Sequence, residues 1–251
     1  MASEGGGGDA APAILAAMAE DVSMLAMLHD REATPERLDV LKSCGFPSSL
    51  LLPPAASRMQ SGTTLVRDAL AQLKAPYPAA QLDELAADYA AIYLTHAYSA
   101  SPLESVWTDA DALAFQEATF RLRTQYRVHG LMVENWRRRS EDHLVVQLHF
   151  VSLLLGRVGM GAIREVASFL DEHLLRWLPM FATRVVGRCA TRFYAGVALL
   201  TDGYCDQMRD VLAEMLGEPR PALQPLPQPG ERGAGAGNEP PPFVPGTGPS
   251  W

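Results

Sequence analysis

The chain has 251 residues, 48% of them hydrophobic, and a formal net charge of −8. This length allows one large domain or two small ones, with enough apolar residues for a buried core. Because proteins that bind nucleic acids usually present a basic face, the acidic balance argues against a nucleic-acid partner and favours a basic one.

The N-terminal residues 1–10 are rich in Gly and Ala, and we expect them to be disordered. No positively charged segment precedes the short apolar run that follows, so the pattern is not that of a secretory signal peptide. The longest apolar run, residues 144–155, contains Gln147 and His149 and is too short for a bilayer span. The three cysteines are widely spaced, which fits reduced thiols. The sequence therefore predicts a cytoplasmic protein without membrane insertion.

Residues 11–217 predict a single globular multi-helix domain of the all-α class. Apolar residues recur at three- and four-residue steps in three stretches: 82–96, 113–126 and 163–177. Gly130 is expected to end the second helix, and Pro179 to begin a further helix at its first turn. Alternating runs closed by hairpin turns, which are typical of strands, are missing.

The run at 144–155 is also expected to be helical, because it has twelve residues and few β-branched ones and follows two acids. Ser140 is the expected N-cap, which would place Glu141 and Asp142 in the first turn. A metal-binding helix would need a second histidine four residues after His143, but Gln147 stands there, so no metal is expected.

Two further stretches complete the chain. Arg137, Arg138 and Arg139 are expected to form a solvated loop, with partner contact as the minor alternative. From Glu218 onward the composition becomes rich in Pro and Gly, so residues 218–251 are expected to be a disordered tail. No motif for nucleophilic catalysis stands out, and no catalytic residue is predicted.

Four stretches follow one another along the chain: "DYAAIYLTHAYSASPLESVWTD", "SEDHLVVQLHF", "FLDEHLLRWLPMFATRV" and "FYAGVALL". Together they resemble the TorD/DmsD/NarJ family of molybdoenzyme maturation chaperones. The second stretch is similar to the family's Asp-His-Leu motif, although Gln147 stands where the family usually has an acid. The resemblance covers roughly residues 14–215.

The resemblance implies an all-helical fold without covalent catalysis. Family members bind the twin-arginine signal peptide of an apo-oxidoreductase in the cytoplasm and hold it until the molybdenum cofactor is inserted. The implied partner is the catalytic subunit of a molybdopterin oxidoreductase. Some members instead assist a nitrate reductase subunit that is not exported. No resident cofactor is implied, although weak guanine-nucleotide binding is claimed for some relatives, and the chain would be a monomer or a domain-swapped dimer.

Recognition of such a leader needs an apolar groove for its helix and acids that face its arginines. The residues expected to supply charge are Glu104, Asp109, Glu141 and Asp142. Those expected to supply apolar contact are Tyr98, Pro102, Leu103 and Trp107, with Ser105 in the same loop. His143 is expected to orient or cap the motif.

Two other classes of function stay open. One is a helical enzyme that uses Asp142 and His143 as acid and base, and it would lose turnover when both are replaced. The other is a helical scaffold or regulator without leader specificity, and it would bind many partners whether or not they carry a leader.

Overall fold

The computed structural model describes residues 10–109, 113–114, 116–157, 159–223 and 226, and these contain helices and no strand. The predicted all-α fold is therefore confirmed. In chain order the elements are α1 (Ala10–Asp30), α2 (Pro35–Ser43), α3 (Ser57–Gln72), α4 (Ala79–Tyr89), η1 (Ala90–Leu94), α5 (Ser105–Thr108), α6 (Glu117–Val128), α7 (Leu144–Leu155), α8 (Met160–Phe169), η2 (Leu170–Leu174), α9 (Leu175–Val186) and α10 (Arg192–Leu216).

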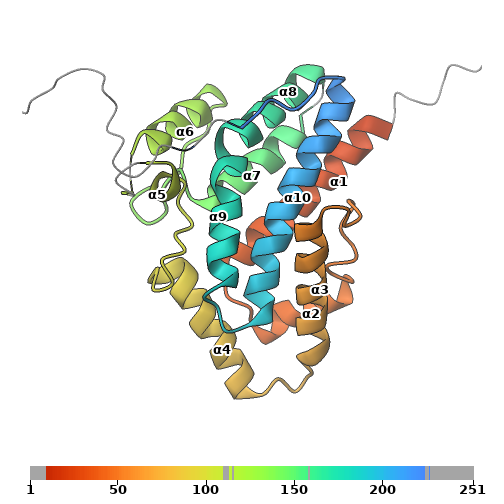
Figure 1. Cartoon of the computed structure of the whole chain (residues 1–251), viewed down its shortest axis with the longest axis vertical. Helices are drawn as coiled ribbons and strands as arrows, with labels where there is room; N and C mark the ends of the chain where they lie inside the picture. The colour runs from red at the N-terminus through yellow and green to blue at the C-terminus, as the bar shows by residue number, and fades with distance from the viewer. Residues whose placement is uncertain (1–9, 110–112, 115, 158, 224–225, 227–251) are drawn as a thin grey trace, which may run out of the picture.

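Helix α10 runs through the middle of the molecule, with α3 on one side and α9 on the other (Figure 1). The backbones of α3 and α10 come very close. A Cβ atom at Gly203 of α10 would lie 2.5 Å from the Met59 nitrogen, so only glycine fits there. Trp177 and Phe181 of α9 and Tyr194 of α10 itself fill the core and are fully buried.

Helix α1 corrects the expectation that no apolar run reaches bilayer length, since its length and composition would allow it to cross a membrane. In this structure α1 packs against α7, and Met18, Val22 and Leu25 are fully buried in the core. The apolar residues of α1 thus form a core helix, and a core helix can have the same length and composition as a membrane-spanning one.

The predicted helix start at Pro179 is wrong, because Pro179 lies inside α9, and the chain stays helical from Met160 to Val186. The π-helical turn η2 lies just before α9. The buried residues Trp177, Leu178 and Phe181 continue the packing stripe on both sides of the proline, and this burial outweighs the missing N–H.

Helix α6 is shorter than the pattern indicated. Leu113 lies before it and is exposed, and Phe120 within it is also exposed, while Leu122 and Tyr126 are buried as expected. Gly130 follows the C-cap with a φ of 70°, which confirms its predicted place at the helix end. At the end of η1, His96 leaves the helix with a φ of 54° and is exposed.

The predicted disordered ends lie mostly outside the described residues, at 1–9, 224–225 and 227–251, although Ala10 already belongs to α1. The first residues after α10 fold back against it. Arg220 pairs with Asp206 and Asp210, both at 2.8 Å. The ordered structure therefore extends past the predicted boundary at 217.

Candidate functional site

Two segments lie side by side just ahead of α7: the crossing loop, residues 102–105, and the stretch 140–143. They carry most of the predicted site residues. Leu103 and His143 form an isolated antiparallel bridge. On either side of it, the Leu144 N–H donates to the Pro102 carbonyl (2.8 Å) and the Glu104 N–H to the Asp142 carbonyl (3.1 Å). Asp142 bonds Ser105, whereas His143 lines a cavity, so these two neighbours face different surroundings.

The start of α7 differs from the prediction. The N-cap is His143 and not Ser140, and the His143 Nδ1 accepts from the Val145 N–H at 3.1 Å. Glu141 and Asp142 therefore lie ahead of the helix, in a turn that the His143 N–H closes by donating to the Ser140 carbonyl at 3.1 Å. The helix itself spans Leu144–Leu155, as predicted.

Asp142 faces inward, into a buried network that joins the crossing loop to α7 and η2. Its Oδ2 accepts from the Ser105 N–H (3.0 Å) and hydroxyl (2.5 Å). The Gln147 amide donates to Glu104 Oε2 and to the Asp142 carbonyl, both at 3.0 Å. His173 Nδ1 lies 3.0 Å from both oxygens of Glu104. All five side chains are buried, so the network serves mainly to fix the loop.

The buried network accounts for an amide, and not an acid, at position 147. An amide at this position supplies a donor to a buried carboxylate, whereas an acid would place a second carboxylate against Glu104. The departure from the family pattern is thus matched to the Glu104 side chain beside it.

Glu141 is also buried and has partners within the chain. Its Oε1 accepts from Arg123 Nε at 2.6 Å, and its carbonyl accepts from the Tyr126 hydroxyl at 3.0 Å. Asp109 is half-buried at the end of α5. Three of the four acids expected to face a partner's arginines, Glu104, Glu141 and Asp142, therefore turn inward in this structure.

The predicted apolar residues are divided between several places. The Tyr98 hydroxyl donates to Asp88 Oδ1 at 2.8 Å, and this carboxylate raises the pKa of Tyr98 to about 12. The half-buried Trp107 donates through Nε1 to the Ser101 carbonyl. Pro102 is buried behind the bridge, and Leu103 is half-buried and lines a cavity.

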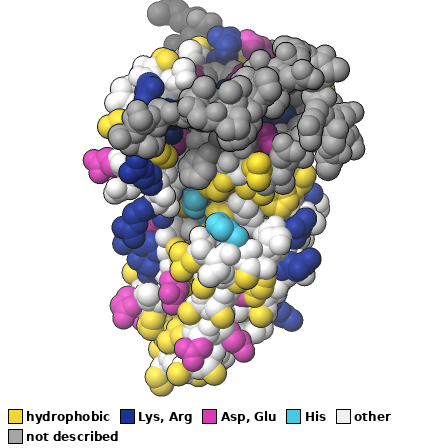
Figure 2. Space-filling view, turned by 90° about the vertical axis from the view of Figure 1, so that its left-hand side faces the viewer, with side chains coloured by type: hydrophobic (Ala, Val, Ile, Leu, Met, Phe, Trp, Pro, Cys, Tyr) yellow, Lys and Arg dark blue, Asp and Glu magenta, His cyan; other side chains and the backbone are white. Residues whose placement is uncertain are grey.

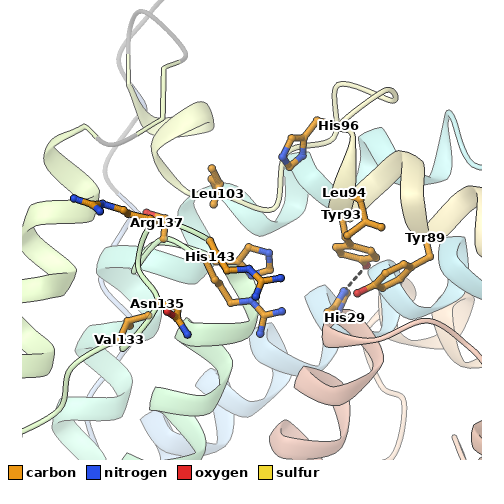
Figure 3. A pocket seen from close by; sticks show the side chains of 13 residues that line it. His29, Tyr89, Tyr93, Leu94, His96, Leu103, Val133, Asn135, Arg137 and His143 are labelled. Atoms are coloured by element: carbon orange, nitrogen blue, oxygen red, sulfur yellow. Dashed lines mark hydrogen bonds between the residues drawn. The ribbon is translucent and has the colours of Figure 1, made fainter.

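This cavity, of about 510 Å³, lies on the side of the bridge that His143 faces. In Figure 3, His29, Tyr89, Tyr93 and Leu94 form one wall, and Val133, Asn135 and Arg137 belong to the other, with His143 between them. The surface view in Figure 2 shows histidine and hydrophobic side chains gathered in the middle of one face, with Lys and Arg along both edges. A cavity of this size is large enough for a small ligand or a peptide side chain.

Both histidines of the cavity are neutral at physiological pH. Burial lowers the pKa of His29 to about 3, and burial followed by the charge of Arg139 does the same for His143. His29 uses both nitrogens inside the protein, bonding the Tyr93 hydroxyl (2.6 Å) and the Thr201 hydroxyl (2.8 Å). His143 accepts through Nδ1, so its Nε2 carries the proton and is a hydrogen-bond donor.

The three consecutive arginines lie in a loop, with Arg137 and Arg138 exposed as predicted, and all three line this cavity. Arg139 pairs with Asp30 at 2.5 Å, and the Arg137 guanidinium lies 5.2 Å from the Trp136 ring centre. Arg138 is exposed, and none of the described side chains pairs with it. Sequence reasoning missed this wall, although the arginines stand directly before the Ser-Glu-Asp-His stretch.

The geometry suits binding better than acid–base chemistry. Asp142 and His143, the pair of the enzyme alternative, bond different partners on opposite sides of one segment. Within the part of the chain that the structure describes, no group of three His, Cys, Asp or Glu side chains could hold a metal ion.

The chain is similar to a group of chaperones. Residues 60–183 match the family described as nitrate reductase delta subunit. The "Chaperone protein TorD" of Vibrio cholerae serotype O1 (strain ATCC 39315 / El Tor Inaba N16961) is 34% identical over 144 residues, which are 54% of this chain and 65% of that relative. That of Vibrio vulnificus (strain YJ016) is 29% identical over 190 residues, or 72% and 87%.

A third relative, the "Tat proofreading chaperone DmsD" of Salmonella typhi, is 28% identical over 105 residues, 42% of this chain and 50% of that protein. The chain thus spans 65% of the length of the Vibrio cholerae relative, just under two thirds. The range matched to the family, 60–183, contains both crossing segments and most of the cavity.

Proposed function

Because the chain belongs to the TorD/DmsD/NarJ family, we propose that it is a maturation chaperone for the catalytic subunit of a molybdopterin oxidoreductase. It acts in the cytoplasm on the apo-form of this client. It binds the client's twin-arginine leader and holds the subunit until the cofactor is inserted, after which export follows. The role requires no catalysis and no resident cofactor.

The observation that supports this proposal best is the position of the cavity within the matched range. Its rim combines the exposed Leu94, 64% accessible, with the half-buried Leu103, and Trp107 follows in the same loop. The buried carboxylate network holds this loop in place. A fixed loop with apolar side chains is suited to an amphipathic leader helix, because less ordering entropy is lost on binding.

Co-purification of the full chain with a candidate client subunit tests the proposal. The apo-subunit with its leader should be captured, and removal of the leader should lower capture at least several-fold. Leu94→Ser should weaken capture, whereas Leu153→Ser, an equally simple change at an exposed site on α7, should not. Failure of the chaperone to capture any client subunit would contradict the proposal.

The description of the matched family favours one alternative client, a nitrate-reductase-type subunit that is not exported. Such a subunit would be captured equally well with and without an N-terminal leader. A scaffold without leader specificity would instead capture unrelated proteins, and Leu94→Ser would not change the selection.

A further inference from the structure

We propose that the cavity between His29 and His143 binds an acidic segment of the client, through side-chain carboxylates flanked by apolar residues. The inference rests on the proposed function and names the part of the client that this site recognises. The leader's arginine pair binds outside this cavity.

Two polar groups of the lining, the His143 ring and the Ser140 hydroxyl, have a donor that no described residue accepts. The Nε2–H of His143 has no hydrogen-bond partner among the described residues, since only its Nδ1 is engaged. The Ser140 hydroxyl is buried, and no described residue bonds it. A buried hydroxyl without a partner is costly, so a ligand that supplies an acceptor gains from filling this place.

The charge of the lining points the same way. Arg137, Arg138 and Arg139 line the cavity, and no Asp or Glu is among its described lining residues. Asp30, outside this lining, is already paired with Arg139. The cationic charge that remains, on Arg137 and Arg138, attracts a carboxylate and repels the two arginines of a leader. A chain with a net charge of −8 therefore has a basic cavity at its candidate site.

The surroundings favour a carboxylate over a phosphate. Phosphate sites commonly use free backbone N–H groups at a helix start. At the start of α7 these groups are engaged: the Leu144 N–H donates to the Pro102 carbonyl and the Val145 N–H to His143 Nδ1. The donors left to the cavity are side chains, and they stand beside the apolar Leu94, Leu103 and Val133. Acidic and apolar side chains that alternate along a peptide match this mixed lining.

Two rhodamine-labelled peptides, Glu-Leu-Glu-Leu-Glu and Gln-Leu-Gln-Leu-Gln, test the inference by fluorescence anisotropy with the full chain. At low salt, about 50 mM, the acidic peptide should bind about tenfold more tightly than the neutral one. Arg138→Ala should clearly lower this preference and leave the fold intact, because the side chain is exposed and unpaired among the described residues. Arg188→Ala, a matched exposed arginine outside the cavity, should leave the preference unchanged.

Equal affinity for the two peptides, or a preference that Arg138→Ala leaves intact, would overturn the inference. It would also fail if pyrophosphate or GTP bound in an Arg138-dependent way while the two peptides did not differ, since the cavity would then be a phosphate site. These results are separable from the proposed function. If a client is captured through its leader but the acidic peptide is not preferred, only the cavity assignment is wrong. If the acidic peptide is preferred but capture does not depend on the leader, only the leader-binding function is wrong.

Discussion

The buried network and the cavity lie on either side of the segment 140–143, and they differ in charge: the network contains the carboxylates of Glu104 and Asp142, whereas arginines line the cavity. On one side Asp142 receives two hydrogen bonds from Ser105 and joins a network that includes Glu104. On the other side the Nε2–H of His143 stays open beside an arginine wall.

The neighbouring residues Asp142 and His143 therefore have different roles. Asp142 holds the loop that carries Glu104 and Ser105, so its loss should act through the fold. His143 faces a ligand-sized space, so its loss should act through binding. The direction of each side chain is fixed by its own partner: Asp142 Oδ2 accepts from Ser105, and His143 Nδ1 accepts from the Val145 N–H.

The largest expected effect is that of Asp142→Ala. The change leaves the N–H and the hydroxyl of Ser105 buried without their acceptor, and the free energy of unfolding should fall by about 3 kcal/mol. Urea unfolding measures the loss. Ser105→Ala removes only one of the two donors and should cost about 1 kcal/mol. A loss for Asp142→Ala no greater than that for Ser105→Ala would contradict an organising role for the carboxylate.

Acidification should have the next largest effect, through the two buried histidines. Both have a folded pKa of about 3, below the unfolded value near 6.5, so the unfolded chain takes up protons first and stability falls as the pH drops below 6.5. From about pH 7.5 to 5.5 each histidine should cost about 1.4 kcal/mol, and both together about 2.7 kcal/mol. Urea unfolding at the two pH values measures the difference, and His143→Asn should halve it. An unchanged drop in that variant would show that His143 is not buried in its neutral form.

The helices next to the site could be predicted from the sequence. The pattern at 144–155 gives α7 with its bounds, and Gly130 gives the end of α6, because local periodicity and cap chemistry decide both. The predicted helix start at Pro179 is wrong, because the burial of Trp177 and Phe181 outweighs the helix-breaking tendency of the proline. Tertiary packing of this kind cannot be predicted from a short stretch of sequence.

The site was only partly predictable for a related reason. The loop at 102–105 and the stretch at 140–143 were both recognised, but their pairing depends on a bridge between residues 40 apart in the sequence. That pairing moves the N-cap from Ser140 to His143 and turns Glu104 and Asp142 inward. The expectation that Glu104, Glu141 and Asp142 face a client's arginines came from the family resemblance and from what leader recognition requires, and neither tells which acids are buried.

Gln147→Glu should weaken the network by about 2 kcal/mol, because it removes the amide donor and adds a second buried charge beside Glu104. Gln147→Met serves as the control, since it removes the donor at similar volume but adds no charge. The glutamate variant should be the less stable of the two in thermal and urea unfolding. Equal stability would indicate that the glutamate finds a proton or a cation, and that Gln147 is not matched to Glu104.

The smallest effect on stability, and the sharpest test of the division, is expected from His143→Asn. Asparagine is a favoured N-cap, so the start of α7 keeps its acceptor and the free energy of unfolding at neutral pH should change by less than about 0.5 kcal/mol. The Nε2–H donor to the cavity is lost, and affinity for the acidic peptide should fall about tenfold, or about 1.4 kcal/mol. Asp142→Asn, measured beside it, should show the opposite pattern, with lower stability and little change in the affinity of the folded fraction. If both variants lose stability and affinity in the same proportion, the two sides of the segment act as one unit, and the cavity has no binding role separate from the network.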